Sequence, residues 1–351
     1  MTCLRRLVEQ ISQDGGGWRG QQLRPIDPLT LADLPGHTPI RLGARFSSAL
    51  SPDGNTLAVL ATTATASFPP PGGGIESTLQ LIDLAGWRDL PTPVTVAGEI
   101  AWLGFAPEGR TLSWLVSADD PATAPTQREY TLYRYVPGAA RVELVSWLPR
   151  GAVGEEFRPS CSGHQLILYN RALDANGQPT DTPQLQFLNL ASGRFVATLQ
   201  LAGVRAVSAG EPGRKAEILV PGLAWDIAHD RLYVAHTDAE LITVVDLGAR
   251  TIVRQADIVG ESPPPSYDLP TYSTETALQM GHARYRFLSV DATGKRLILS
   301  GREMITTPLP GGRWQAHDRI ETPRSLDAIT FSARATLPAH SNVLAATERG
   351  C

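Results

Sequence analysis

The sequence is poor in cysteine, in lysine and in long hydrophobic runs, and each shortage excludes a class of protein. Its three cysteines, one near each end and one at Cys161, provide neither a framework of disulfides nor the paired spacing of a zinc site. No apolar run approaches the roughly 20 residues that a membrane-spanning helix needs. Lysine occurs only at Lys215 and Lys295, and 31 basic against 35 acidic residues give a net charge of −4, which argues against nucleic acid as a partner.

The common signatures of catalysis and cofactor binding are missing as well. The sequence has no G-x-S-x-G nucleophile motif, no phosphate-binding loop, no dinucleotide fingerprint and no C-x-x-C pair. Residues Asp174 to Gly177 fit an Asn-Gly turn better than a calcium loop, because the ligand spacing and the final glutamate are absent. We therefore expect no cofactor, no metal site and no catalytic residues.

The first 20 residues are basic but lack the hydrophobic segment of a secretory signal. We expect residues 1–20 to be a poorly ordered extension or a short helix. An anchor encoded upstream in a longer gene would place the protein outside the cytoplasm, so the sequence leaves the compartment open.

Glycine and proline are abundant, with 32 and 28 residues, and both suit short strands joined by turns. One phrase recurs five times: an apolar strand, a tight turn that ends in glycine, two residues, then leucine and a second apolar strand. Glycine suits the turn because it adopts a positive φ at little cost, and histidine, which replaces it once, also tolerates that region. The turn anchors are Gly54, Gly109, Gly163, His229 and Gly294, and a sixth begins at Gly350.

A second phrase follows most copies and reads Leu/Ile-x-x-apolar-Asp/Asn. It occurs at 79–83, 185–189 and 242–246, and its Asp or Asn side chain can cap a turn by accepting the backbone N–H two residues on. Each unit therefore has four strands, which we name A to D, with no helix between them. Four-stranded units repeated around a ring are the signature of a β-propeller.

We predict an all-β chain: a β-propeller of four-stranded antiparallel blades in a single domain, residues 21–351. The chain supplies five complete blades and part of a closing blade, in a ring of six or seven. Residues 21–42 provide strands C and D of the closing blade, and residues 340–351 begin another blade whose strand B is missing, so we expect a truncated chain. The complete blades cover about residues 43–97, 98–150, 151–205, 218–260 and 282–339.

The fourth unit, DRLYVAHTDAELITVVDLGARTIV, resembles the bacterial YVTN-type propeller repeat, and the SPDG and APEG turns are similar to those of WD-repeat-like propellers. No blade carries the Gly-His and Trp-Asp pairs of eukaryotic WD repeats, so the resemblance does not imply a signalling scaffold. Propellers with similar repeats include sugar-lactone hydrolases and the large subunit (β chain) of quinoprotein amine dehydrogenases.

The strand connections divide unequally between the two faces of a propeller. The A–B and C–D turns are short, whereas the B–C and D–A connections, which share the other face, are long. Long loops in a compact fold are usually functional or disordered. Because all of them fall on one face, we expect this insertion-rich face to bind something. The long connections are residues 63–77, 118–127, 172–182 and 302–323 between strands B and C, and residues 261–282 between strands D and A.

We favour a non-catalytic binding or interaction module, with an unknown protein or small-molecule ligand on this face. Its mixture of aromatic and polar side chains is typical of recognition surfaces, although loops without any ligand explain it equally well. The alternative is an enzyme or enzyme subunit: a lactonase-like site needs convergent His, Glu and Arg, and an amine dehydrogenase-like chain needs a partner subunit. The candidate ligand-binding residues are Tyr267, Tyr272, His282, Arg284, Arg302, Trp314, His317, Asp318 and Arg319.

Overall fold

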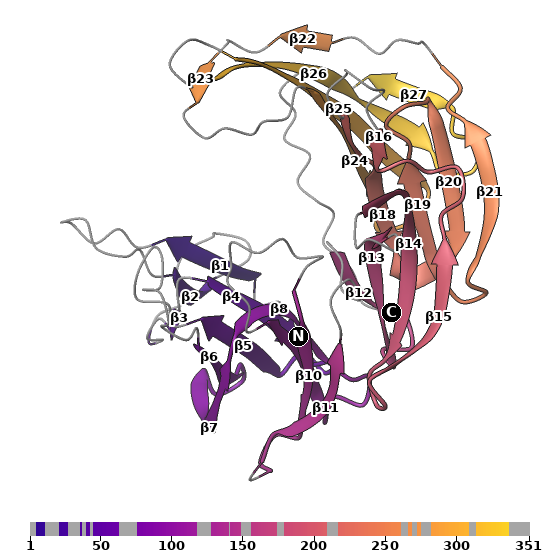
Figure 1. Ribbon diagram of the computed structural model, residues 1–351. Coiled ribbons are helices and arrows are strands. Elements are labelled where there is room, and N and C mark those ends of the chain that lie inside the picture. Colours follow the sequence, from indigo (N-terminus) through magenta and orange to yellow (C-terminus); the bar gives the residue numbers. More distant parts are fainter. Residues whose placement is uncertain are drawn as a thin grey trace. The chain divides into compact units, whose positions relative to one another are not determined.

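In the computed structural model, the described part of the chain consists mainly of strands joined by turns (Figure 1). Within the described part of the chain, a short 3-10 helix, η2, spans Ile227–His229, and no helix has the length and hydrophobicity to cross a membrane. The structure describes residues 5–10, 21–26, 36, 40–42, 45–62, 76–117, 128–139, 141–148, 156–173, 179–208, 217–260, 266–268, 272–274, 282–308 and 314–336.

The chain forms two compact units, and the first contains two four-stranded antiparallel sheets. This unit comprises residues 1–153 and 189–194. Its sheets are blades 1 and 2, at the positions that the repeat predicts, and in each blade consecutive strands pair. Blade 1 is β4 (Arg45–Leu50), β5 (Thr56–Thr62), β6 (Glu76–Asp83) and β7 (Arg88–Ala97); blade 2 is β8 (Glu99–Phe105), β9 (Leu112–Ser117), β10 (Tyr130–Tyr135) and β11 (Glu143–Leu148).

The second unit, residues 154–188 and 195–351, contains blades 3 to 5. All three are again antiparallel meanders, so the all-β class and the four-stranded propeller blade predicted from the repeat are present. Blade 3 is β12 (Glu156–Pro159), β13 (Gln165–Leu173), β14 (Pro179–Asn189) and β15 (Arg194–Gln200); blade 4 is β18 (Gly222–Asp226), β19 (Arg231–Ala235), β20 (Leu241–Asp246) and β21 (Thr251–Asp257); blade 5 is β24 (His282–Val290), β25 (Arg296–Pro308), β26 (Trp314–Asp327) and β27 (Ala333–Thr336).

The hydrophobic core lies between neighbouring blades, because the central strands bury both of their faces. In β19, Leu232 and Val234 belong to a cluster shared with blade 3, whereas Tyr233 and Ala235 belong to a cluster shared with blade 5. Successive side chains of a strand point to opposite faces, so one strand contributes to two cores. The leucines that follow each turn, Leu57, Leu112, Leu166, Leu232 and Leu297, are all buried.

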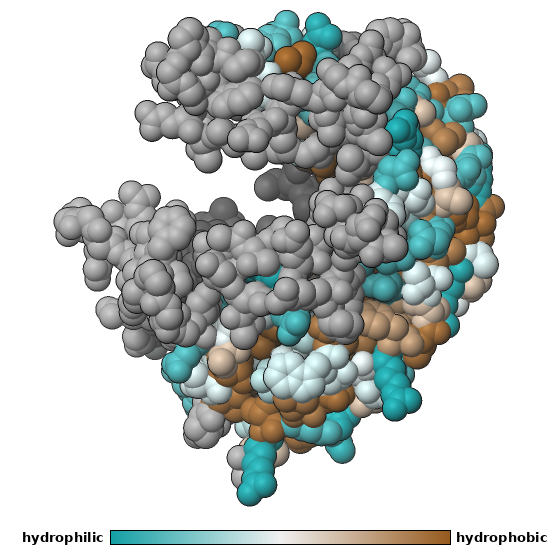
Figure 2. Space-filling view, in the orientation of Figure 1, coloured by the Kyte–Doolittle hydropathy of each residue, from teal (hydrophilic) through white to brown (hydrophobic). Residues whose placement is uncertain are grey.

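The edge strands follow a different pattern. Strand β21 lies at the edge of its sheet and alternates between exposed and half-buried residues. Figure 2 shows hydrophobic and hydrophilic residues interspersed over β20 and β21. This mixture keeps the edge of blade 4 from presenting a continuous apolar surface, which would favour aggregation.

The A–B turns use a residue with positive φ, but the fourth copy differs from the prediction. Gly54, Gly109, Gly163 and Gly294 have φ values of 75°, 71°, 65° and 69°. In blade 4 the residue with positive φ is Asp230, at 52°, and not His229. The 3-10 helix η2 closes this turn through the Asp230 N–H, which donates to Ile227 O at 3.1 Å, and moves the left-handed residue one position along. Gly350 lies outside the described residues.

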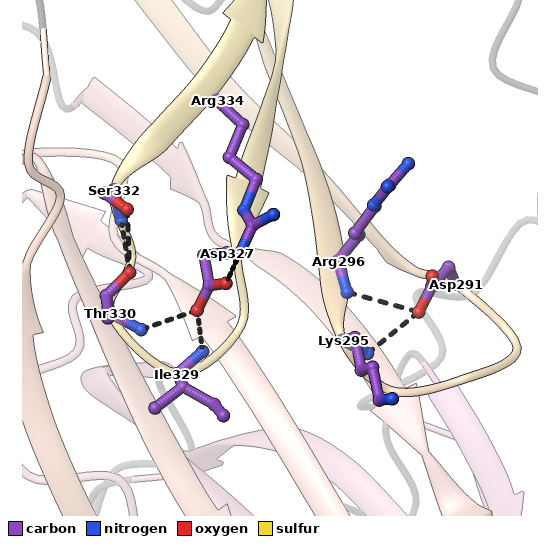
Figure 3. A network of polar contacts seen from close by, with 8 residues as sticks. All are labelled: Asp291, Lys295, Arg296, Asp327, Ile329, Thr330, Ser332 and Arg334. Carbon is purple, nitrogen blue, oxygen red and sulfur yellow. Dashed lines mark hydrogen bonds and ion pairs between the residues drawn. The ribbon is translucent and has the colours of Figure 1, made fainter.

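The C–D turns are capped by the Asp or Asn of the second phrase. Asp83 and Asn189 each accept the backbone N–H groups two and three residues on, at 2.9–3.1 Å, which confirms the predicted capping. Asp327 does the same and also pairs with Arg334 (Figure 3). The neighbouring A–B turn is closed by Asp291, whose carboxylate accepts the backbone N–H groups of Lys295 and Arg296.

The N-terminal segment contains a strand where we expected a poorly ordered extension or a short helix. Strand β1 (Arg5–Gln10) pairs antiparallel with β2 (Gln21–Ile26), which pairs with β3 (Ile40–Leu42). The free edge of β2 offers backbone partners, and pairing of this kind overrides weak local preferences. Strands β2 and β3 lie within residues 21–42, which we assigned to the closing blade, and here they form a separate three-stranded sheet with β1. Residues 340–351 lie outside the described residues.

Cys161, in the A–B turn of blade 3, is disulfide-bonded. The sequence did not predict this bond, because pairing depends on which distant segments the fold brings together. Its partner lies outside the described residues.

The Asp327 cap predicts a pH-dependent stability. The backbone N–H groups of Thr330 and Ile329, followed by Arg334, lower the pKa of Asp327 from 3.8 to about 2. Because the folded-state pKa is the lower one, the stabilisation is complete above about pH 4 and is lost as the pH falls towards 2. Asp327→Ala should lower the melting temperature at pH 7, and its difference from wild type should shrink between pH 4 and 2.

Two variants control this measurement by thermal unfolding. Asp327→Asn should keep most of the stability at pH 7, because Asn189 shows that an amide caps the same turn. Asp257→Ala changes an exposed carboxylate in β21 and should have little effect. A constant difference between wild type and Asp327→Ala across pH 2–7 would contradict the role of the ionised carboxylate.

Candidate functional site

Two insertions that we predicted as long loops form strands on blade 5. The B–C connection 302–323 is a long hairpin in which β25 runs to Pro308 and β26 begins at Trp314. The D–A connection contains β22 (Ser266–Asp268) and β23 (Tyr272–Thr274). Both short strands pair with β26, so cross-strand hydrogen bonds order residues that carry no hydrophobic repeat. The described part of the chain excludes residues 63–75 and 118–127, where other insertions were predicted.

Blade 5 thereby becomes the centre of an eight-stranded sheet. The outer edge of β26 pairs in turn with β27, β22 and β23. At the other side, β24 pairs in parallel with β17 (Glu217–Val220), which in turn pairs with β16 (Val207–Ser208). In Figure 1 the β25–β26 hairpin extends beyond the other strands of the blade, towards β22 and β23. All nine candidate residues lie in strands of this sheet.

Four charged residues form a row across the extended sheet, which we name the charge ladder: Asp268, Arg319, Glu303 and Arg284. The register pairs Asp268 with Arg319, Arg319 with Glu303, and Glu303 with Arg284, on β22, β26, β25 and β24. The signs alternate along the row. Arg319 Nε lies 3.4 Å from Asp268 Oδ1, and Arg284 Nε lies 3.4 Å from Glu303 Oε1. The ladder is therefore electrically neutral but locally polarised.

Two histidines extend the ladder on the same face. His282 Nε2 lies 2.7 Å from Glu303 Oε1, and His317 Nε2 lies 3.3 Å from Asp268 Oδ1. The side chains of Asp268 and Arg319 are both 55% exposed, whereas Glu303 and His282 are about half as exposed. The ladder is thus most accessible at its outer end, and the side chain of Arg284 on β24 is again more exposed than that of Glu303.

Arg302 and Asp318, which we also singled out, belong to the opposite face of the sheet. They are one residue away from ladder residues along their strands, so their side chains point the other way. Arg302 binds Asp318 with two hydrogen bonds, at 2.7 and 3.1 Å, and the Asp318 side chain is only 3% exposed. Asp318 is therefore a buried structural partner of Arg302 and does not share the surface of the ladder.

The three aromatic candidates are placed by their backbone register alone. Tyr267 lies opposite Ile320, Tyr272 opposite Ala316, and Trp314 opposite Thr274. The two tyrosines lie on strands that pair with the outer half of β26, and Trp314 is the first residue of β26 itself. Their side chains lie outside the described residues.

The structure also has a buried cluster of charges that the sequence did not suggest: Arg286, Glu321, Glu240 and Arg324. Arg286 binds both Glu321 and Glu240, and Arg324 Nη2 donates to Glu240 Oε2 at 2.8 Å. The two arginine side chains are 8% and 5% exposed. The cluster adjoins the charge ladder one row further into blade 5 and connects it to the B–C turn of blade 4.

Gly301 makes room for this cluster. It lies between Arg286 and Glu321 in the register of β24, β25 and β26. A Cβ at this position would lie 2.7 Å from the Glu321 carboxyl group, so any side chain would displace it. A glycine within an otherwise regular strand often marks such a close approach, and it is the one sequence signal that could have found the cluster.

The two carboxylates of the cluster respond differently to their surroundings. Burial opposes ionisation of Glu240, but Arg286 and Arg324 outweigh it and lower the pKa of this residue. For Glu321 burial is again the largest influence, and with the nearby Glu240 and Glu303 carboxylates it raises the pKa above the usual value despite Arg286. The cluster therefore favours ionisation of Glu240 and disfavours ionisation of Glu321.

Among the described residues, no three His, Cys, Asp or Glu side chains converge as a metal site would require. Within the part of the chain that the structure describes, the candidate site thus consists of ion pairs and histidines on an open sheet.

Comparison with known proteins gives no family. No family model and no curated protein matches the chain. Solved structures do match. The β-propeller domain of the trilobed protease from Pyrococcus furiosus is 9% identical with a TM-score of 0.41, covering 85% of this chain and 71% of that one. Hydrazine synthase from Kuenenia stuttgartiensis is 12% identical with a TM-score of 0.36, covering 83% and 94%.

A third match is puromycin hydrolase, at 18% identity and a TM-score of 0.46, covering 96% of this chain but 48% of that one. The chain therefore spans about half the length of this hydrolase. Similarity at these levels gives no argument about function, which has to come from the site itself.

The buried cluster predicts a large effect of Arg286→Met on stability. Removing the arginine leaves the Glu321 carboxylate without its partner and weakens the pairing of Glu240, which should cost about 3–5 kcal/mol in the free energy of unfolding. Chemical denaturation measures this loss. The double variant Arg286→Met with Glu321→Leu should recover part of it, because removing both partners leaves no uncompensated charge. Equal stability of wild type and Arg286→Met would contradict the pairing.

Proposed function

We propose that this chain is a non-catalytic β-propeller binding module that holds a polypeptide partner on the charge ladder of blade 5. The alternation of sign across four neighbouring strands carries the proposal. A partner with charges of both signs can pair with such a row, and this complementarity provides specificity and a defined register. A polyanion such as nucleic acid would meet Asp268 and Glu303 as repulsive groups.

The fold supports this role in a second way. Ladder residues lie on strands that are paired on both sides, except at β22, so their positions are fixed by the sheet. We further propose that the two units belong to one propeller domain of six or seven blades and that its repeats are of the bacterial YVTN type. The DRLYVAHTDAELITVVDLGARTIV unit supports this assignment.

Charge reversal on the ladder tests the binding function. Peptides selected by display on the purified chain should contain both acidic and basic residues. Their affinity for Arg284→Glu/Arg319→Glu, measured by biolayer interferometry, should fall at least tenfold, and higher salt should weaken their binding to wild type. The neutral variant Arg284→Gln/Arg319→Gln should lie between the two.

Arg231→Glu is the matched control, because it reverses the charge of an exposed arginine beside the A–B turn of blade 4. This turn lies at the opposite end of the blades from the charge ladder. It should bind the selected peptides as tightly as wild type does. Peptides that bind the reversed ladder as well as wild type, or that are uniformly acidic, would rule out the proposed surface.

One observation favours the alternative, an enzyme of lactonase-like type. Such a site needs convergent His, Glu and Arg, and Glu303 contacts both His282 and Arg284. A carboxylate at 2.7 Å orients the imidazole, which could then act as a general base on a water molecule while Arg284 stabilises a developing oxyanion.

This second function predicts hydrolysis of simple aliphatic lactones. If it operates, His282→Gln should lower kcat/KM by about 10²–10⁴-fold, because it removes the base. His317→Gln changes the other ladder histidine, which contacts Asp268 and not Glu303, and should leave the rate unchanged. Turnover that is absent from wild type, or equal in His282→Gln, would eliminate the catalytic alternative.

A further inference from the structure

A cavity of about 270 Å³ lies between blades 3 and 4, at the end of the blades that carries the A–B and C–D turns. It is therefore at the opposite end of the blades from the charge ladder. Its lining contains both polar and apolar residues. The polar lining consists of Ser160, Ser162, Gln165, Asp230 and Arg250, and the remaining lining residues are Ile167, Phe187, Leu247 and Gly248.

One of the cavity's lining residues, Arg250, occupies a C–D turn position that carries an aromatic residue in two other blades. Four residues after the capping Asp or Asn, the chain adopts a positive φ, between 47° and 63°, in blades 1, 3, 4 and 5. Blades 1 and 5 place large aromatic residues there, Trp87 and Phe331, and both are buried. Phe331 fills the space between blades 4 and 5 together with Tyr233 and Val244. Arg250 occupies this position in blade 4 and is only half-buried.

Arg250 is held in place but is not neutralised by the described residues. Its guanidinium lies 5.3 Å from the centre of the Phe187 ring, and its Nη2 lies 3.4 Å from Gln165 Oε1, longer than an ordinary hydrogen bond. Within the described part of the chain it makes no ion pair and no other hydrogen bond.

The opposite charge in the cavity is Asp230, which also has a positive φ, of 52°. Gly248 lies beside it, and a Cβ at this position would be 3.7 Å from the Asp230 carboxylate, in ordinary van der Waals contact. The hydroxyl groups of Ser160 and Ser162, which lie 3.1 Å apart, line the cavity beside these two charges. One guanidinium and one carboxylate in a small cavity favour a ligand that carries both signs.

We propose that this cavity binds a small zwitterion of the amino-acid class, with its carboxylate on Arg250 and its ammonium group on Asp230. The aliphatic side chain of the ligand packs against the apolar part of the cavity lining. The volume accommodates about ten non-hydrogen atoms, the size of leucine. A simple carboxylate would leave Asp230 unpaired, and a polyanion would be repelled by it. This site is independent of the binding function proposed for the charge ladder.

Isothermal titration calorimetry with leucine, glycine, acetate and ethylamine tests the proposal on the full chain. Leucine should bind measurably and more tightly than glycine, and at least tenfold more tightly than acetate or ethylamine. Arg250→Phe should weaken leucine binding at least tenfold, because it restores the aromatic residue of blades 1 and 5. The variant should fold, since Phe331 has a φ of 55° at the same turn position. Asp230→Asn should weaken leucine binding without weakening that of acetate.

Arg254→Ala is the matched control. This arginine lies 4.7 Å from the ring of Phe331, in a similar cation–π contact that lines no part of the cavity. Leucine should bind this variant as it binds wild type, and melting temperatures confirm that all three variants fold. Absence of leucine binding at 10 mM, or equal affinity of wild type and Arg250→Phe, would overturn the proposal. Acetate binding as tightly as leucine, unaffected by Asp230→Asn, would show a carboxylate site and also overturn it.

Discussion

Within each unit the blades depend on one another, because the central strands of their sheets are apolar on both faces. In blade 1, Leu60 and Leu81 face the core shared with blade 2, while Val59 and Ile82 face a separate cluster on the other side. A four-stranded sheet with two apolar faces is unstable in water until both are covered. Stacking of blades within each unit satisfies this requirement, and it leaves little freedom to change residues at the middle of a strand.

Charged groups can therefore accumulate only where the repeat is interrupted. The long β25–β26 hairpin continues past the region that packs on blade 4, and there hydrophobic residues give way to the charge ladder. Arg286 marks the boundary. It lies on the same face as Leu288, which is part of the core with blade 4, and its charge is tolerated because Glu240 and Glu321 accept its hydrogen bonds. Site and core are thus continuous within one sheet.

The repeating features of the fold could be predicted from the sequence because they depend on local chemistry. A positive φ at Gly54 and capping by Asp83 follow from the residues of a single turn, and five copies in register reinforce each other. The shift from His229 to Asp230 could not be predicted, because η2 has the same length as the glycine turn and differs only in its hydrogen bonding. The strands β22 and β23 could not be predicted either, because their stability comes from pairing with β26, more than 40 residues away.

The geometry of the candidate residues could not be predicted from the sequence. All nine candidate residues lie in strands of one sheet, yet alternation of side chains along β25 and β26 puts Arg302 and Asp318 on the face opposite to Arg284 and Arg319. The spacing of residues along a predicted loop does not show to which face of a sheet each side chain points, since side chains in a loop do not alternate with a fixed period. Glu303 and Asp268, the acidic half of the ladder, were overlooked because their importance depends on the cross-strand register.

The same reasoning explains how one repeated framework can hold both the charge ladder and the cavity between blades 3 and 4. A repeat fixes the backbone at equivalent positions, so a single exchange of side chain changes the local chemistry without rebuilding the turn. Phe331 and Arg250 share a turn position and a left-handed φ, yet one completes a core and the other borders a polar cavity. Gly301 has a comparable effect in β25, where the absence of a side chain allows Arg286 and Glu321 to meet across the strand. In both places stability comes from the neighbouring blades, so the position that departs from the repeat is free to differ in chemistry.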